Sequence, residues 1–446
     1  MTVATTATEH ADAVVVGARP AGAACAIALA RAGRRVVALD HARFPSDTLS
    51  THLLFAGGVA EIARIGALAR VDALEAPPLR EALMGGAGMT VRGTYTPIDG
   101  IAHGLCVRRT GLDAAFVDTA REAGAEVREQ CRVVDLIRSE ARVAGVRYRD
   151  AEGGEHELRA PLVVGADGRR STVARLVGAT EPYRSNANGR ACYFAYLEDG
   201  RPEWREIAAQ WRDGAELGTA FPCDDRLLLV LLMPPMSRAE DFRGALEEEW
   251  DRTAHSIAGL DERLEGCKRV SKVRSAIDTT SYFRRSSGPG WALPGDAGHF
   301  KDPVTAQGIR DALLYGRLLG EMAAPVLDDA SGLDSALRRW ERRRERECLE
   351  LYAWTNRLGR GEAMTALEVE LYRAAQREPT LGSEMLDVFS RLRRPSEVFP
   401  ARKALALAVR ALRRPDADRP AVLREVLADG RTELADRFER VRARVA

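Results

Sequence analysis

Lysine is almost missing from this sequence. Four lysines (Lys268, Lys272, Lys301 and Lys403) stand among 66 basic residues, so arginine carries nearly all of the positive charge. The 65 acidic residues almost cancel the basic ones. A protein that binds nucleic acid or an anionic membrane through its bulk charge is therefore disfavoured.

Paired cysteines and long apolar runs are missing too. The seven cysteines contain no Cys-x-x-Cys pair and their number is odd, which argues against a zinc site and a disulfide framework and favours a reducing cytoplasm. Residues 1–11 have no apolar signal core, and the longest apolar run, residues 227–233, is too short to span a bilayer. We therefore expect a cytoplasmic chain with no membrane span, no metal site and roughly two or three folded units.

The first ordered segment has the pattern of a βαβ unit. Residues 12–16 are rich in Val and predict a short buried strand, and a glycine-containing turn over residues 17–22 follows. Small aliphatic residues over 21–32 predict a closely packed helix, and residues 35–39 predict a second strand. This order and size are typical of an element that binds a dinucleotide.

Individual residues of this unit indicate how a dinucleotide is held. Gly17 allows the tight turn, Gly22 lets the helix press against the sheet, and Asp40 ends the second strand, where an acid binds a ribose hydroxyl. Free N–H groups at the helix N-terminus favour the pyrophosphate. Arg19 stands at the middle glycine of the fingerprint, so its side chain is expected either to point away or to grip the cofactor.

Two later motifs place Asp beside Gly directly after a predicted buried strand. The first contains Asp167 and Gly168, and the second contains Gly295 and Asp296. A helix that begins near Gly308 would aim a further N-terminus at an anionic group. Each motif alone is an ordinary strand–loop turn, and only their combination is specific.

Together the three motifs resemble those of the FAD-dependent oxidoreductases of the p-hydroxybenzoate hydroxylase fold, over roughly residues 12–360. The last motif looks closest to the branch of geranylgeranyl reductases and flavin-dependent halogenases. The resemblance implies an α/β fold with a Rossmann-like FAD-binding domain, an inserted antiparallel-sheet substrate domain and a helical C-terminal region. We expect the first over residues 1–75, 101–180 and 284–360, the second over 76–100 and 181–283, and the third over 361–446.

The resemblance also implies roles in an FAD site. The glycine turn and Asp40 would hold the ADP half, Arg109 would reach the FAD, and Asp296 would bind the ribitol region. Ala306 stands where the family usually has Gly in the turn that lines the flavin ring. The expected cofactor contacts are Gly17, Ala18, Arg19, Ala21, Gly22, Asp40, His41, Arg43, Ser50, Thr51, Arg109, Val133, Val134, Asp167, Gly168, Gly295, Asp296, Pro303, Ala306, Gln307, Gly308 and Ile309.

Candidates for chemistry and substrate binding have competing structural interpretations. His52 follows a segment that resembles the family's path along the cofactor, and it could act as a general base or as a hydrogen-bond donor to the flavin. His299 belongs to the third motif, which the resemblance places near the flavin. A structural role is the commoner one for such histidines. Four aromatic residues of the inserted sheet could form the floor of an apolar pocket or plain core: Tyr193, Tyr196, Trp211 and Phe221.

The resemblance leaves several functions open. The favoured one is an NAD(P)H-dependent monooxygenase of secondary metabolism, in which reduced FAD activates O2 as a C4a-hydroperoxide that hydroxylates an apolar or aromatic small molecule. The alternatives are an FAD-dependent reductase of the geranylgeranyl reductase type and a non-catalytic flavin-binding interaction protein. Flavin-dependent halogenases carry a Trp-x-Trp motif and a catalytic lysine in the earlier part of the chain. A halogenase is therefore disfavoured here, because no two of the six tryptophans lie two apart and no lysine precedes Lys268. The sequence has no second glycine fingerprint that would indicate a separate NAD(P)H-binding domain. We therefore expect NAD(P)H to bind transiently beside the FAD, and the alternative is that a separate flavin reductase supplies the electrons.

Overall fold

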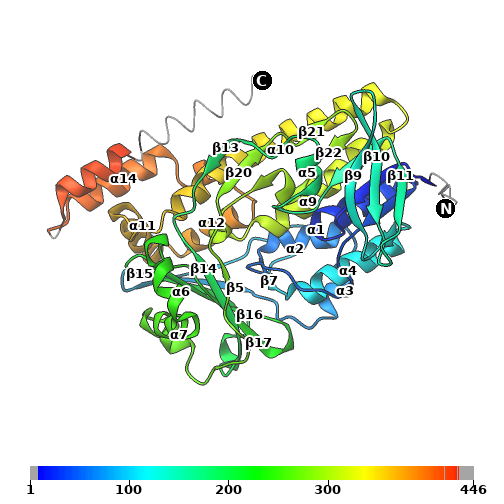
Figure 1. The fold of residues 1–446 in the computed structure, drawn as a ribbon. Coiled ribbons are helices and arrows are strands. Elements are labelled where there is room, and N and C mark those ends of the chain that lie inside the picture. The colour runs from blue at the N-terminus through cyan, green and yellow to red at the C-terminus, as the bar shows by residue number, and fades with distance from the viewer. Residues whose placement is uncertain (1–8, 416, 429, 431–446) are drawn as a thin grey trace.

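The structure, a computed structural model, describes residues 9–415, 417–428 and 430. It has the predicted α/β architecture, with a Rossmann-like parallel sheet, a large antiparallel sheet and a helical C-terminal region (Figure 1). The parallel sheet has the strand order β21-β22-β12-β2-β3-β8, and only β21 runs antiparallel to its neighbour. Its strands are β2 (Ala13–Val16), β3 (Val36–Leu39), β8 (Glu126–Arg128), β12 (Leu162–Gly165), β21 (Ser287–Gly288) and β22 (Trp291–Ala292).

Both faces of the parallel sheet are covered, which explains the continuous apolar runs of its central strands. Ala13 and Val15 of β2 face a core that is built with helices, whereas Val14 and Val16 face the opposite side. The helical side contains α1 (Pro20–Arg31), α2 (Ala56–Arg64), α3 (Leu68–Asp72), α4 (Arg109–Glu122), α9 (Gly308–Ala323) and α10 (Ala330–Leu358). The opposite side carries α5 (Thr172–Leu176) and a sheet of β1 (Glu9–His10), β9 (Arg132–Ser139), β10 (Arg142–Arg149) and β11 (Glu155–Arg159).

The large sheet is antiparallel except where β15 runs parallel to β5. Helices α6 (Ala239–Gly244), α7 (Leu246–Ser256) and α8 (Leu260–Arg263) follow its last long strand in the chain and pack on one face. The other face packs against the short pair β4 (Leu53–Leu54) and β7 (Leu105–Cys106). The strands are β5 (Glu81–Gly86), β6 (Met89–Thr94), β14 (Cys192–Glu198), β15 (Ile207–Asp213), β16 (Glu216–Pro222), β17 (Leu227–Leu232), β18 (Lys268–Arg269) and β19 (Arg274–Ala276).

A three-stranded sheet is formed by β13 (Pro182–Asn186), β20 (Ser281–Arg284) and β23 (His299–Phe300). The C-terminal region comprises α11 (Ala366–Arg377), α12 (Pro379–Phe389), α13 (Pro395–Val398) and α14 (Ala401–Leu412). Helices α11 and α12 pack on β6, where Tyr372 and Leu381 share a core with Met84 and Val91. Within the described residues, every helix is either too short or too polar to cross a bilayer.

Candidate functional site

The three motifs meet at the carboxyl ends of β2 and β12. These strands are neighbours, and Ala166 donates its N–H to the carbonyl of Val16 at 2.7 Å. Gly17 has a φ of +94°, and a Cβ on it would lie 2.5 Å from the carbonyl oxygen of Ala166. Glycine is therefore required at this turn for conformation and for space. The first and second motifs form one cradle.

The third motif joins the cradle through the crossing of α1 and α9. A Cβ on Gly320 would lie 2.8 Å from the carbonyl oxygen of Cys25, and a Cβ on Gly295 would lie 2.9 Å from the Cβ of Ala21. The helices therefore cross with their backbones nearly in contact. Helix α1 begins at Pro20 beside the glycine turn and α9 begins at Gly308 beside Asp296, so the first and third motifs each contribute free N–H groups of a helix N-terminus. This cradle fits the phosphates and flavin of a bound FAD.

Asp40 holds the glycine turn from the side. Its carboxylate accepts the N–H of Ala18 at 2.7 Å and that of Ala42 at 2.8 Å, and the residue is 2% exposed. Its carbonyl accepts the N–H of Cys131 at 2.8 Å, which brings the start of β9 alongside. Two residues of β9, buried Val133 and half-buried Val134, are thereby near the position expected for adenine. Of the other predicted contacts on this side, His41 and Arg43 are exposed and Ser50 and Thr51 are half-buried.

Arg19 contacts side chains from two other segments. Its guanidinium pairs with Asp113 of α4 and donates to the Ser46 hydroxyl at 2.9 Å, while its cationic carbon lies 5.5 Å from the centre of the Phe44 ring. Arg109 binds the same Asp113 carboxylate through two hydrogen bonds of 2.8 Å. One buried carboxylate therefore ties together two arginines that were both predicted to be cofactor contacts.

The two acids of the later motifs differ in their surroundings. Asp167 accepts from the Ser171 hydroxyl at 2.5 Å and from the N–H of Thr172 at 2.7 Å, so it binds the first turn of α5 and its N-cap residue, Ser171. Asp296 makes no side-chain hydrogen bond within the described part of the chain, and burial raises the pKa of its carboxyl. It lines a small cavity with Gly295 and Gly308. A half-buried carboxylate that makes no side-chain hydrogen bond among the described residues fits a ribitol hydroxyl.

The turn expected to line the flavin ring keeps its glycine-like backbone despite the substitution. Ala306 has φ +50° and ψ +41°, the left-handed region that glycine adopts most easily. Pro303 begins the preceding turn, where Asp302 accepts the N–H of Val304 at 2.9 Å. The Gln307 amide donates to the carbonyl of Phe389 at 2.8 Å. The C-terminal helices thus help to hold this turn.

His52 is fully buried and forms a pair with Tyr196. Its Nδ1 lies 2.7 Å from the Ser50 carbonyl, which can only accept, so Nδ1 carries the proton. Nε2 therefore accepts the Tyr196 hydroxyl at 2.6 Å. Burial, and then the charge of Arg109, lower the pKa of His52 to about 4. A histidine that stays neutral at pH 7 is a weak base, so this geometry favours a positioning role for His52.

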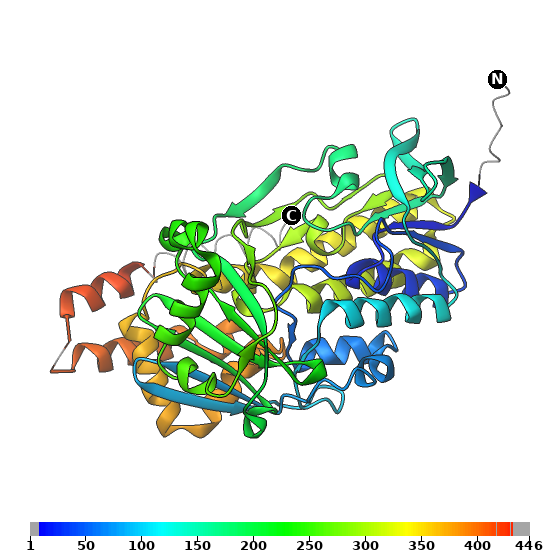
Figure 2. The same ribbon diagram turned by 60° about the horizontal axis from the view of Figure 1, so that its bottom comes forward.

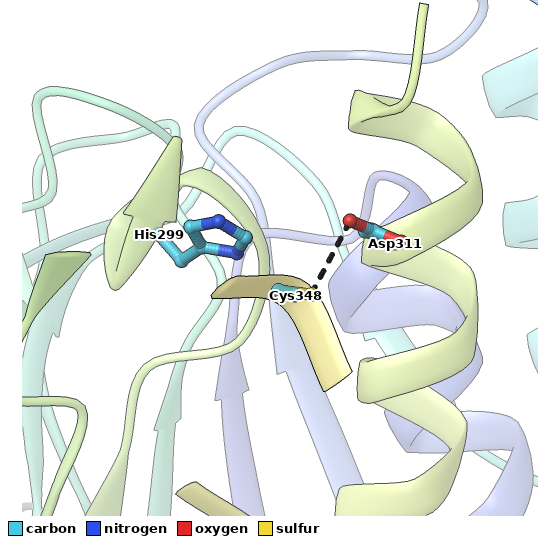
Figure 3. A group of neighbouring side chains, drawn as sticks. All are labelled: His299, Asp311 and Cys348. Atoms are coloured by element: carbon cyan, nitrogen blue, oxygen red, sulfur yellow. Dashed lines mark hydrogen bonds between the residues drawn. The ribbon is translucent and has the colours of Figure 1, made fainter. Parts of the chain in front are cut away.

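His299 belongs to a buried group with Asp311 and Cys348 (Figure 3). Its ring stacks on Phe283 at a centroid distance of 4.1 Å, and burial followed by the charge of Lys301 lowers its pKa well below the usual range. Asp311 already pairs with Lys301 and accepts from Cys348 Sγ at 3.6 Å. Because a cation occupies the carboxylate, the group is an ion-pair cluster and a poor ligand set for a metal.

The four aromatic residues proposed for the substrate pocket divide between the faces of the large sheet. Tyr196 and Phe221 lie on the face that packs against Val304 and Ala306 of the flavin turn. Tyr193 and Trp211 lie on the opposite face, under α6 to α8. The alternation of side chains along β14 requires this division, because Tyr193 and Tyr196 are an odd number of residues apart.

Several site residues escaped the sequence analysis. Asp113 has a local signal, since it lies four residues after Arg109 on a predicted helix. Lys301 has one too, because it is a rare lysine placed inside a motif and is buried against Asp311. Phe389 has none: its contact with Gln307 joins positions 82 residues apart.

Comparison with known proteins places this geometry in context. The model of a family described as FAD binding domain matches residues 10–346. A menaquinone reductase of Mycolicibacterium smegmatis is 33% identical over 336 residues, which cover 70% of this chain and 76% of that protein. Digeranylgeranylglycerophospholipid reductase 2 of Methanopyrus kandleri is 27% identical over 352 residues, covering 75% and 82%. A flavoprotein/dehydrogenase structure from Cytophaga hutchinsonii shares the fold, with a TM-score of 0.76, 17% identity and coverage of 90% and 99%.

Proposed function

This chain belongs to the FAD-binding-domain family of FAD-dependent oxidoreductases, and from that premise we propose that it is a reductase of a carbon–carbon double bond in an apolar, isoprenoid-bearing molecule. The observation that carries the proposal is the similarity to curated reductases. The menaquinone reductase and the digeranylgeranylglycerophospholipid reductases are each matched over more than two thirds of their own length. Their printed substrates share isoprenoid character.

The site supports an apolar substrate. The sheet face beside the flavin turn presents Phe194, Tyr196 and Phe221 toward Val304 and Ala306. Two thiols extend the same face, since Cys106 and Cys223 are fully buried with their sulfur atoms 3.0 Å apart. Burial raises the pKa of Cys106 well above its usual range, so its thiol stays protonated and packs as an apolar group.

A bound FAD, once reduced, would supply a hydride to the substrate. The chain's own residues would do the rest. The apolar face binds the hydrocarbon and excludes water, and Ala306 with the N-terminus of α9 supports the flavin edge. Tyr196 brings a protonated hydroxyl to this face, and burial raises its pKa above the usual range. The hydroxyl donates to His52 Nε2 at 2.6 Å, so its proton must turn from His52 to the substrate. We propose Tyr196 as the donor of that proton, with its phenolate reprotonated once the product leaves, and His52 as its positioning residue.

The monooxygenase interpretation stays as the second candidate. A dry, apolar face beside the flavin turn would also suit oxygen chemistry, which bulk water disrupts, and the fold alone hosts both reactions. In either case NAD(P)H is the proposed reductant, and a separate flavin reductase is the alternative source of electrons. A flavin-binding interaction protein without turnover is the third possibility.

One experiment separates these functions. Purified FAD-loaded protein is reduced without oxygen and mixed with menaquinone or with a geranylgeranyl lipid. We expect reoxidation of the flavin with formation of a product in which one carbon–carbon double bond of the isoprenoid chain is saturated, a product distinct from the quinol that reduction of the quinone ring alone would give. Reoxidation only in air, with substrate-dependent oxygen uptake and an oxygenated product, would replace the reductase with the monooxygenase. No turnover with either acceptor or with oxygen would favour the binding protein. Bleaching of the flavin by NADPH tests the reductant separately.

A further inference from the structure

Exposed apolar side chains gather in the last described part of the chain. Leu405 and Val409 of α14 are 64% and 38% exposed, and Leu423 and Leu427 of the following helical residues 419–428 are 50% and 62% exposed. Each pair is spaced i, i+4 and so forms a stripe on one helix face. We call these four residues with their flanking arginines the arm surface. Large apolar stripes on a protein surface mark interaction sites.

The inner faces of the two helices are already used. Leu407, Ala408 and Ala411 bury the other side of α14, and Val422 buries the other side of residues 419–428. Glu425 accepts the N–H of Ala366 at the start of α11. Among the described residues, the arm surface is therefore the exposed side of a docked pair of helices, at the end of the molecule opposite the N-terminal strands (Figures 1 and 2).

Arginines flank the apolar stripes. Arg402 and Arg410 of α14, and Arg419 and Arg424 beyond it, are exposed, and no ion pair within the described residues involves them. Residues 401–446 hold twelve Lys or Arg against seven Asp or Glu, whereas the whole chain has a net charge of only +1. The rest of the protein is therefore slightly acidic, and positive charge is concentrated in this segment.

We propose that the arm surface docks on the surface of an anionic lipid bilayer. Helices with leucine on one stripe and arginine beside it lie in the plane of the membrane interface, where the apolar stripe enters the acyl boundary and the arginines meet lipid phosphates. A second copy of the chain would have to place its own arginines against these, and like charges repel. The positive charge of the arm surface therefore favours an anionic bilayer over a second copy of this chain as its partner. The proposal does not depend on the reaction that the flavin site performs.

Sedimentation with vesicles tests it. Full-length FAD-loaded protein is mixed with vesicles of phosphatidylcholine alone or of equal parts phosphatidylcholine and phosphatidylglycerol. We expect pelleting with the anionic vesicles only, weakened by salt. Leu405→Gln combined with Leu423→Gln should lower the partition coefficient at least about tenfold, and Arg402→Gln with Arg410→Gln should lower it about fivefold for each arginine removed.

Matched controls separate docking from general stickiness. Val270→Gln removes an apolar residue that is 47% exposed on the large sheet, and Arg342→Gln removes an exposed arginine of α10. Both should pellet like the wild type. Bound-FAD absorbance checks that every variant is folded. The proposal is overturned if the wild type does not pellet with anionic vesicles, or if the Leu405→Gln, Leu423→Gln variant pellets as the wild type does. It is also overturned if the only effect of the leucine and arginine double variants is to convert a dimer into monomers in sedimentation velocity.

Discussion

The two halves of the candidate site are built differently. The cofactor half is made of backbone: Gly17 presses on Ala166, and α1 crosses α9 at Gly320 with almost no side chain between them. The substrate half is made of side chains that come from distant segments, with His52, Tyr196 and Cys106 on different strands and loops. The first half tolerates almost no added atom. The second is defined by packing and hydrogen bonds, which different side chains can supply.

The largest expected effect tests the backbone half. Gly22→Val places a Cβ where it overlaps the carbonyl oxygen of Gly17, and no flexible side chain can yield there. We expect the variant to lose FAD binding and most of its folded yield, an effect of at least about 4 kcal/mol. Absorbance of the purified protein near the flavin band and recovery from expression measure it. Gly244→Ala is the control, since a Cβ there meets nothing within 4 Å; equal losses in both would contradict the argument.

A pH effect tests the side-chain half. The pKa of His52 falls from 6.5 when unfolded to about 4 when folded, so the unfolded chain binds a proton that the folded protein rejects. This histidine's contribution to stability is complete above pH 6.5 and is lost as the pH falls toward 4, by about 3 kcal/mol in all.

The melting temperature of the His52→Asn variant should therefore fall less than that of the wild type when the pH is lowered over that interval. Asparagine is the suitable replacement, because residue 52 has a φ of +63° and asparagine tolerates the left-handed region. Identical pH profiles for the two proteins would show that His52 is not buried as a neutral ring.

This contrast also explains what the sequence could predict. The βαβ unit is local, and the helix predicted over residues 21–32 is observed at Pro20–Arg31. The three motifs were recognisable because each consists of adjacent residues with fixed backbone demands. The pattern over residues 126–136, in contrast, predicts one strand. The chain instead makes β8 and β9 in different sheets, and the left-handed Gln130 turns it between them.

Contacts between residues that lie far apart in the sequence could not be predicted from it. The sequence pattern over residues 242–257 predicts one helix. The chain instead breaks at Ala245 between α6 and α7. The face on which each aromatic residue lies depends on strand register, so Tyr193 and Tyr196 could not be distinguished by residue type. The hydrogen bond from Gln307 to Phe389 depends on tertiary packing.

A smaller effect tests the role of Tyr196 in turnover. Tyr196→Phe removes the hydroxyl that His52 holds at 2.6 Å. If this hydroxyl delivers the proton, kcat should fall about a hundredfold while KM changes little. Tyr193→Phe is the matched control, because it removes a hydroxyl from the opposite sheet face that has no hydrogen-bond partner among the described residues. A KM change without a kcat change in Tyr196→Phe would assign the residue to binding alone.

The smallest effect joins the two halves through Arg19. Its guanidinium ties the glycine turn to Ser46 and Asp113. Arg19→Gly restores the usual fingerprint but releases the segment that runs from the cofactor half toward His52. We expect FAD affinity to fall only about tenfold, the value of one charge-assisted hydrogen bond, and fluorescence titration of the apoprotein with FAD measures it. Asp113→Asn should act similarly, and Arg31→Gln, whose side chain bonds to the carbonyl of Ile65 at 2.9 Å, should not. A loss of a thousandfold would instead mean that Arg19 grips the cofactor directly, and the cofactor half would then depend on a side chain as the substrate half does.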